Sequence, residues 1–203
     1  KRFPTTNDEG ILVNALVIPS EKLMIRIGSL EENEQLLAGS TVLATRGNGS
    51  IQTQWNEEIL IIEHRWHLYQ KNDIALKQDF ELITKNRKSQ EVSSSNTLIG
   101  ARNLLFLEEG AVVEASILNT TTGPIYIGKD AEIMEGSIVR GPLAMCEHSA
   151  LKLGTKIYGA TTLGPHCKVG GEVNNVIFQS YSNKGHDGFL GNSLIGEWCN
   201  LGA

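Results

Sequence analysis

The chain has 203 residues, a formal net charge of −5 and 40% apolar residues. That length and apolar content are enough to bury a core, so we expect a globular protein. The negative net charge and the absence of a run of lysines or arginines argue against nucleic acid or an anionic membrane as the main partner. No stretch approaches about 18 uninterrupted apolar residues, so the sequence predicts neither a membrane span nor a signal peptide. A cytoplasmic location follows by default.

The first region, residues 1–86, has an α/β pattern. ILVNALVIP (residues 11–19) is typical of a strand, the spacing of apolar residues over 18–39 predicts a helix that ends at Gly39, and STVLATR (residues 40–46) predicts another strand. A short apolar run near residue 60 then leads into a helical pattern that includes Leu68, Ile74, Phe80 and Ile83. The polar stretch 85–96 follows it, so we expect this helix to connect two domains.

The second region, residues 87–203, repeats with a period of six. Aliphatic residues stand at unbroken spacing of six at Ile127, Ile133, Val139, Met145, Leu151, Ile157, Leu163 and Val169. Small residues mostly stand four positions after them, and the pattern resumes in a new register at Phe189, Ile195 and Leu201. This period predicts a triangular coil with one short strand per side, an inward aliphatic residue on each side and a small residue at each corner.

The repeat resembles that of the left-handed parallel β-helix acyltransferases. GPIYIGKDAEIMEGSIVRGP, KIYGATTLGPHCKVGGEVNN and SNKGHDGFLGNSLIGEWCNLGA are similar to the acetyltransferase half of the bifunctional glucosamine-1-phosphate acetyltransferase/UDP-N-acetylglucosamine pyrophosphorylase family, in the alternative form found in Bacteroidetes. HRWHLYQKND (residues 64–73) resembles the end of a sugar-nucleotidyltransferase domain. The resemblance implies an α/β nucleotidyltransferase-like fragment followed by a left-handed β-helix. Because the glycine-rich nucleotide loop is missing and Lys1 and Ala203 are unusual ends, we expect a fragment of a longer protein that is itself inactive.

The resemblance places a general base at His186. An amine that attacks the thioester of acetyl-CoA must lose a proton, and an imidazole with a pKa near its ordinary value of about 6.5 accepts one at neutral pH. Glycines on both sides, Gly185 and Gly188, allow the tight backbone that an exposed side chain needs. Asp187 is a candidate for orienting the ring.

The resemblance carries further roles to five other positions. Asn200 and Glu172 match residues that contact the sugar, Lys156 matches a phosphate contact, Asn174 matches a substrate-binding position and Ala203 meets acetyl-CoA with its backbone. Three positions depart from the family. Lys156 replaces an arginine and loses its bidentate fork, Asn174 replaces a lysine, and Phe189 replaces a tyrosine. Either other residues bind the phosphate, or the substrate is not glucosamine-1-phosphate.

Two histidines and two cysteines are candidates for a metal site or for packing. His148 and His166 are 18 residues apart, one full coil, so they should stack on one face. A zinc site there lacks a third ligand at a fitting spacing, and we predict no metal site. Cys167 and Cys199 occupy the small corner position and should be packing residues, and the odd number of three cysteines without a CxxC pair indicates reduced thiols.

The resemblance implies acetyl transfer from acetyl-CoA to an amino-sugar 1-phosphate, a homotrimer, and Mg²⁺ as a cofactor that the missing nucleotidyltransferase half would use. Two alternatives remain open. The protein could be a nucleotidyltransferase whose β-helix is an oligomerisation platform, or the β-helix could be a non-catalytic scaffold.

Overall fold

The computed structural model describes residues 10–202 and divides the chain into two compact units, residues 1–63 and 64–203. The elements of the first unit are β1 (Ile11–Val13), β2 (Val17–Ile18), α1 (Glu21–Gly28), β3 (Glu34–Ala38), β4 (Thr41–Arg46), β5 (Ile51–Gln54) and β6 (Leu60–Ile61). A four-stranded sheet has the order β1-β4-β3-β5, in which only β3 and β5 are parallel, and β2 pairs with β6 in an antiparallel ribbon. The strand expected over residues 40–46 is confirmed.

The other two expectations for the first region need correction. The stretch 11–19 forms two strands because Asn14 ends the first, its side chain donating to the carbonyl of Val42 and accepting from the amide of Leu16. Helix α1, capped by the Ser20 hydroxyl, ends at Gly28, and within the remainder of the expected helix Glu34–Ala38 form strand β3. Asn33 has a φ of 66°, which a helix does not tolerate, and β3 gains partners on both sides from β4 and β5.

An ion pair joins helix and sheet inside the first unit. Glu34 is 4% exposed, and its carboxylate accepts hydrogen bonds from Arg26, the Glu31 amide and Thr53. The bonds from Arg26, Glu31 and Thr53 lower the pKa of Glu34 to about 2. The buried carboxylate therefore stays charged, and it ties α1 to β3 and β5.

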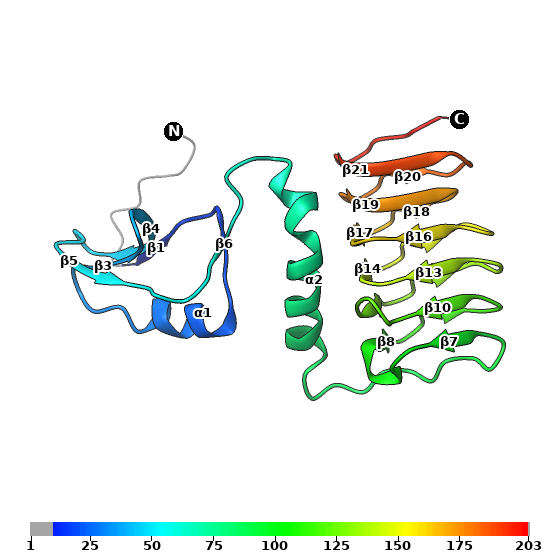
Figure 1. Cartoon of the computed structure of the whole chain (residues 1–203), viewed down its shortest axis with the longest axis horizontal. Coiled ribbons are helices and arrows are strands. Elements are labelled where there is room, and N and C mark those ends of the chain that lie inside the picture. Colours follow the sequence, from blue (N-terminus) through cyan, green and yellow to red (C-terminus); the bar gives the residue numbers. More distant parts are fainter. Residues whose placement is uncertain (1–9, 203) are drawn as a thin grey trace. The chain divides into compact units, whose positions relative to one another are not determined.

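The second unit begins with the expected helix and continues as stacked coils (Figure 1). Its elements are α2 (His67–Thr84), β7 (Thr97–Ile99), η1 (Arg102–Leu104), β8 (Leu105–Leu107), β9 (Val112–Val113), β10 (Ile117–Asn119), β11 (Ile125–Ile127), β12 (Glu132–Ile133), β13 (Ile138–Arg140), β14 (Leu143–Met145), β15 (Ala150–Leu151), β16 (Lys156–Tyr158), β17 (Thr161–Leu163), β18 (Lys168–Val169), β19 (Glu172–Phe178), β20 (Asn183–Lys184) and β21 (Phe189–Ile195). No helix of the described residues is long and apolar enough to cross a membrane.

The coils have three faces on which each strand pairs in parallel with the strand of the next coil. The first face contains β7, β10, β13 and β16 and continues into the first halves of β19 and β21. The second face contains β8, β11, β14 and β17 and continues into the second halves of β19 and β21. The third face contains β9, β12, β15, β18 and β20. This long, curled parallel sheet has the form expected of a β-helix. The left-handed winding of the coils stays a prediction.

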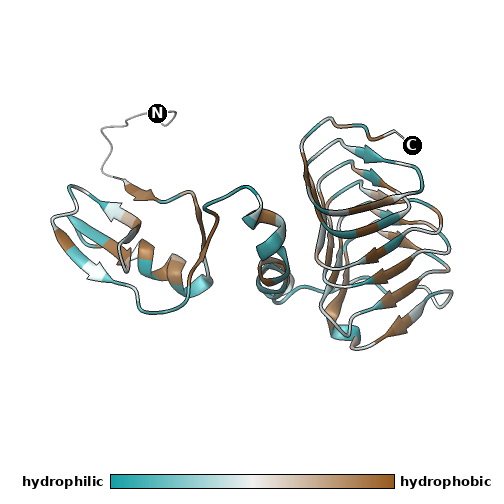
Figure 2. Cartoon of the chain, turned by 45° about the horizontal axis from the view of Figure 1, so that its top comes forward, coloured by the Kyte–Doolittle hydropathy of each residue, from teal (hydrophilic) through white to brown (hydrophobic). Residues whose placement is uncertain are grey.

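The period of six is the packing rule of the coils. All eight aliphatic positions from Ile127 to Val169 are at most 1% exposed and belong to one hydrophobic core. Figure 2 shows the apolar colour along the strands of the coils. Corner hydroxyls such as Thr155 Oγ1 donate to nearby carbonyl oxygens, here that of Lys152 at 2.6 Å, so the small polar residues satisfy the turns.

The register in the last coils differs from the expected one. Phe189 is 63% exposed, and Leu190 packs against the core instead. Strands β19 and β21 run through the corner between the first and second faces, so the inward positions Leu190 and Ile195 are five residues apart rather than six. Gly170 and Gly171 shorten another corner, and inward Val173 follows inward Val169 after only four residues.

Helix α2 packs against the coils of its own unit, at β17, β19 and β21. Leu76 and Phe80 are buried, and the buried Asn72 amide donates to the Ala160 carbonyl and accepts from Thr162. The helix therefore lies in the second compact unit, although the sequence pattern groups it with residues 1–86.

Truncation of the inward column should destabilise the coils. Leu163→Ala removes a side chain that is fully buried, and we expect the unfolding free energy of this unit to fall by about 2–5 kcal/mol. Leu153 is 68% exposed, so Leu153→Ala should change the unfolding free energy by no more than about 0.5 kcal/mol. Urea denaturation followed by circular dichroism measures both, and equal losses would contradict the inward assignment of Leu163.

Candidate functional site

The first face of the coils carries three of the expected substrate-binding residues. Lys156 pairs in register with Glu172, and Tyr158 pairs with Asn174, in adjacent strands of one parallel sheet. Register partners on neighbouring parallel strands lie about 4.8 Å apart, and alternate residues point to the same side. The fold therefore brings Lys156, Glu172 and Asn174 together on the outer surface of one face.

A hollow of about 580 Å³ lies over this face. Its lining includes Lys156 and Glu172 together with Arg140, Tyr158 and Asp73 of helix α2, whereas Asn174 is not part of it. Arg140 was missed in the sequence analysis, although it ends a first-face strand, β13, as Tyr158 ends β16. Its guanidinium and the Lys156 ammonium are suited to an anion, and the two carboxylates are suited to hydroxyl or ammonium groups.

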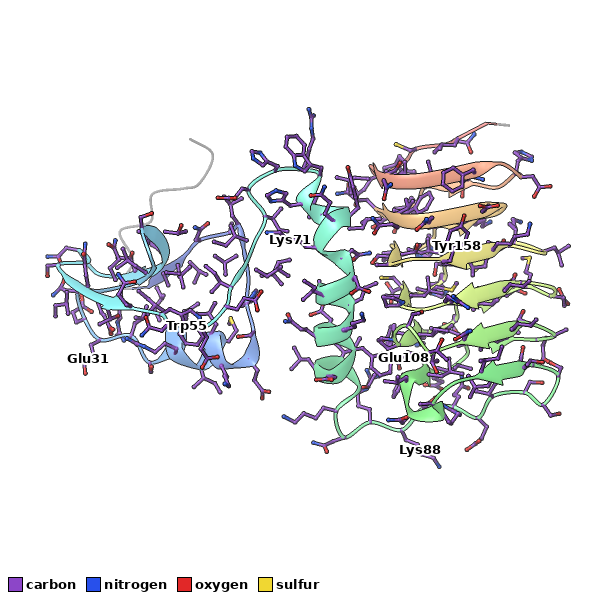
Figure 3. All side chains as sticks on the ribbon, viewed as in Figure 1. Glu31, Trp55, Lys71, Lys88, Glu108 and Tyr158 are labelled. Carbon is purple, nitrogen blue, oxygen red and sulfur yellow. The ribbon has the colours of Figure 1, made fainter. Side chains whose placement is uncertain are left out.

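Tyr158 is hydrogen-bonded within this hollow to the carboxylate of Glu172, to which its hydroxyl donates. Tyr158 is labelled in Figure 3 on the stacked coils. The bond to Glu172, burial and the negative charge of Glu172, in that order, raise the pKa of Tyr158. At neutral pH the pair thus presents a phenol that holds the carboxylate oxygen of Glu172 in place.

His186 lies on the turn 185–188, between β20 of the third face and β21 of the first face. Its side chain is exposed and lines a second hollow of about 270 Å³ with Lys184, Asp187, Phe189 and Leu201 among its neighbours. In the described part of the chain, no hydrogen bond joins the side chains of His186 and Asp187, so the expected orienting role of Asp187 has no support in this geometry.

Asn200 lies elsewhere, on the third face. It forms an isolated parallel bridge with Asn183, is exposed, and lines neither hollow. Ala203 lies outside the described residues. A single chain therefore gathers Lys156 and Glu172 in one hollow and His186 in another, and leaves Asn200 apart from both.

The two corner histidines stack as expected. The rings of His148 and His166 are 4.9 Å apart, and the stack continues through Tyr181 at 4.9 Å and Trp198 at 4.5 Å. Among residues 10–202, no group of three or more histidine, cysteine or acidic side chains is placed to hold a metal ion. The rings form a ladder along one corner of the coils.

The corner cysteines differ in exposure. Cys167 is fully buried, its thiol donates to the Gln179 carbonyl at 2.8 Å, and burial raises its pKa. A neutral buried thiol is a packing residue, as expected. Cys199 is only half-buried at the corresponding corner of the last coil.

One comparison with known proteins found a match over part of the chain. Residues 1–88 match the family model of sugar nucleotidyl transferases. No curated protein matches the chain. The match covers less than half of the 203 residues, and it includes the first compact unit and helix α2. The matched region therefore ends shortly after helix α2.

Replacing Glu172 should change the titration of Tyr158. In Glu172→Gln the negative charge is gone, so we expect the pKa of Tyr158 to fall toward the ordinary value of a tyrosine. Ultraviolet titration of the phenolate measures this, and Tyr158→Phe assigns the transition. Glu132→Gln, at an exposed third-face position, is the matched control. An unchanged pKa in Glu172→Gln would show that Glu172 does not raise it.

Proposed function

We propose that the coils transfer an acetyl group from acetyl-CoA to the amine of an amino-sugar 1-phosphate, with glucosamine-1-phosphate as the substrate. The product serves UDP-N-acetylglucosamine synthesis. One observation carries this proposal: Lys156, Glu172 and Phe189 stand in register in three successive strands of the first face, and His186 lies three residues before Phe189. Two strand spacings are roughly 10 Å, a length that a hexosamine phosphate and its flanking side chains can span.

His186 acts as the general base. The amine nitrogen of the sugar attacks the carbonyl carbon of the thioester, and the imidazole takes the proton that the nitrogen sheds. The carbon–sulfur bond then breaks, the amide forms, and the thiolate of coenzyme A leaves and takes up a proton. The exposed ring lies on the turn that leads into the first face, three residues before Phe189.

The first-face hollow holds the sugar phosphate. Lys156 and Arg140 contact the phosphate. Lys156 stands where the family has an arginine, and Arg140 supplies the guanidinium that is lost there. The Tyr158–Glu172 pair accepts hydrogen bonds from the sugar, and Asn174 contributes an amide at the next coil.

Asn200 and the backbone of Ala203 contact sugar and acetyl-CoA in a homotrimer. The three faces of a coil make side-by-side packing geometrically natural, and a neighbouring copy would bring its third face to the site. This arrangement accounts for a site in which Asn200 lies apart from the first-face residues of its own chain.

A second candidate function rests on the match of residues 1–88 to the sugar nucleotidyl transferases. In that case the protein joins a sugar phosphate to a nucleotide with Mg²⁺, and the coils only assemble the copies. Release of pyrophosphate from UTP without thiol release from acetyl-CoA would favour this function. Absence of acetyl-CoA binding would favour a non-catalytic scaffold.

Removal of the base should abolish acetyl transfer. For the full-length protein, we expect His186→Ala to lower kcat for thiol release from acetyl-CoA with glucosamine-1-phosphate by a hundredfold or more. His148→Ala, in the corner ladder, is the matched control and should retain activity. Wild-type turnover that survives in His186→Ala would exclude this base.

The phosphate contacts should separate phosphorylated from unphosphorylated acceptors. We expect Lys156→Met and Arg140→Met each to raise the KM for glucosamine-1-phosphate about tenfold or more, because each removes a charge-assisted hydrogen bond. The KM for glucosamine itself should not change. Lys129→Met, at an exposed position outside the hollow, is the control. Equal effects on both acceptors would place the phosphate elsewhere.

A further inference from the structure

Lys184 occupies a position of the coils that the repeat reserves for an aliphatic side chain. It pairs in register with Val169 on the third face, and below Val169 the same inward column contains Leu151, Ile133 and Val113. Lys184 is only 6% exposed. A buried ammonium group lowers the stability of the folded state unless hydrogen bonds satisfy it. The partners of Lys184 therefore have to be accounted for.

The Lys184 ammonium links two successive corners of the coils. Its Nζ donates to the carbonyl of Gly170 at 2.8 Å and to the carbonyl of His186 at 2.9 Å. At the same corner of lower coils, a hydroxyl closes the turn, as Thr155 does on the Lys152 carbonyl. The Gly170–Gly171 corner has no hydroxyl side chain. There the Lys184 ammonium donates the hydrogen bond that closes the corner, and it does the same for the turn 185–188.

Gly171 leaves the space for this ammonium. A Cβ atom there would lie 2.9 Å from Lys184 Nζ and 2.7 Å from the carbonyl oxygen of Gly188. Its φ of +75° also favours glycine. The lysine and the glycine below it therefore form one built contact beneath the turn that carries His186.

We propose that Lys184 is a positioning residue that holds the turn 185–188 so that the His186 imidazole points at the substrate, an inference that rests on the proposed function of His186 as base. Within residues 10–202, the His186 carbonyl accepts no other hydrogen bond. Gly185 and Gly188 flank the histidine and leave the turn free to adopt many conformations. A fixed carbonyl removes that freedom, and a misplaced base loses much of its rate advantage.

Asp187 favours the charged form of Lys184 at this buried position. Burial lowers the pKa of Lys184, and the negative charge of Asp187 opposes that change. Asp187 thus supports the ammonium from the turn itself. This arrangement gives Asp187 a place in the turn other than the ring-orienting one expected from its position beside His186.

The test separates positioning from stability. Lys184→Met keeps a long, unbranched side chain and removes the two hydrogen bonds. In the full-length protein we expect kcat for acetyl transfer per folded molecule to fall at least tenfold and the KM values for acetyl-CoA and acceptor to stay within about twofold. The unfolding midpoint in urea should fall, because the carbonyls of Gly170 and His186 lose their donor. Lys168→Met, an exposed lysine on the neighbouring strand, should alter none of these. An unchanged kcat, or a loss that only follows the loss of folded protein, overturns the proposal.

A second readout does not depend on catalysis. The ring protons of His186, assigned in the NMR spectrum by their absence in His186→Ala, should move in Lys184→Met toward the shifts of an unstructured peptide. Unchanged shifts overturn the positioning role. If the shifts move while the wild type transfers no acetyl group, the positioning role stands and the proposed function fails.

If Lys184→Met does not fold, NMR measurements on the wild-type protein test the proposal. Protons on Lys184 Nζ should then exchange slowly with solvent and show nuclear Overhauser effects to the His186 backbone. Rapid exchange without these effects overturns the proposal.

Discussion

The column of aliphatic side chains inside the coils is the constraint on which the second unit depends. Parallel pairing of each strand with the next coil fixes which residues face inward, and these residues are completely or almost completely buried from Ile127 to Val169. A one-residue slip would turn an inward side chain outward. The period of six therefore decides at once the core, the corners and the outward positions that are free for chemistry.

Two of the candidate residues, Glu172 and His186, stand where the chain departs from that period. Gly170 and Gly171 shorten one corner, β19 and β21 run through another, and Lys184 replaces an aliphatic residue in the column. Glu172 follows the shortened corner directly, and His186 follows Lys184. Regular coils need no such departures, so we interpret them as the local distortion that a site requires, held in place by the regular column beneath it.

Helix α2 belongs to both descriptions of the chain. The match to sugar nucleotidyl transferases extends through it, whereas Asn72, Leu76 and Phe80 pack it on the coils. The hydrogen bond from the Asn72 amide to the Ala160 carbonyl holds the helix on the coils of its own unit.

The sequence by itself determined the repeat, the inward column, strand β4, the long helix and the stacking of His148 on His166, because each follows from a short-range periodicity. Only the tertiary structure decided the strand identity of Glu34–Ala38, the inward place of Leu190 over Phe189, and the clamp of Lys184 on Gly170 and His186. Those outcomes depend on contacts that no local periodicity reports: strands that pair on both sides of β3, and corners of different length that shift the register. Arg140 joined the first-face hollow for the same reason, since the coil brings it beside Lys156 and Tyr158. Periodicity predicts which way a side chain points, but only the closed coil decides what it meets there.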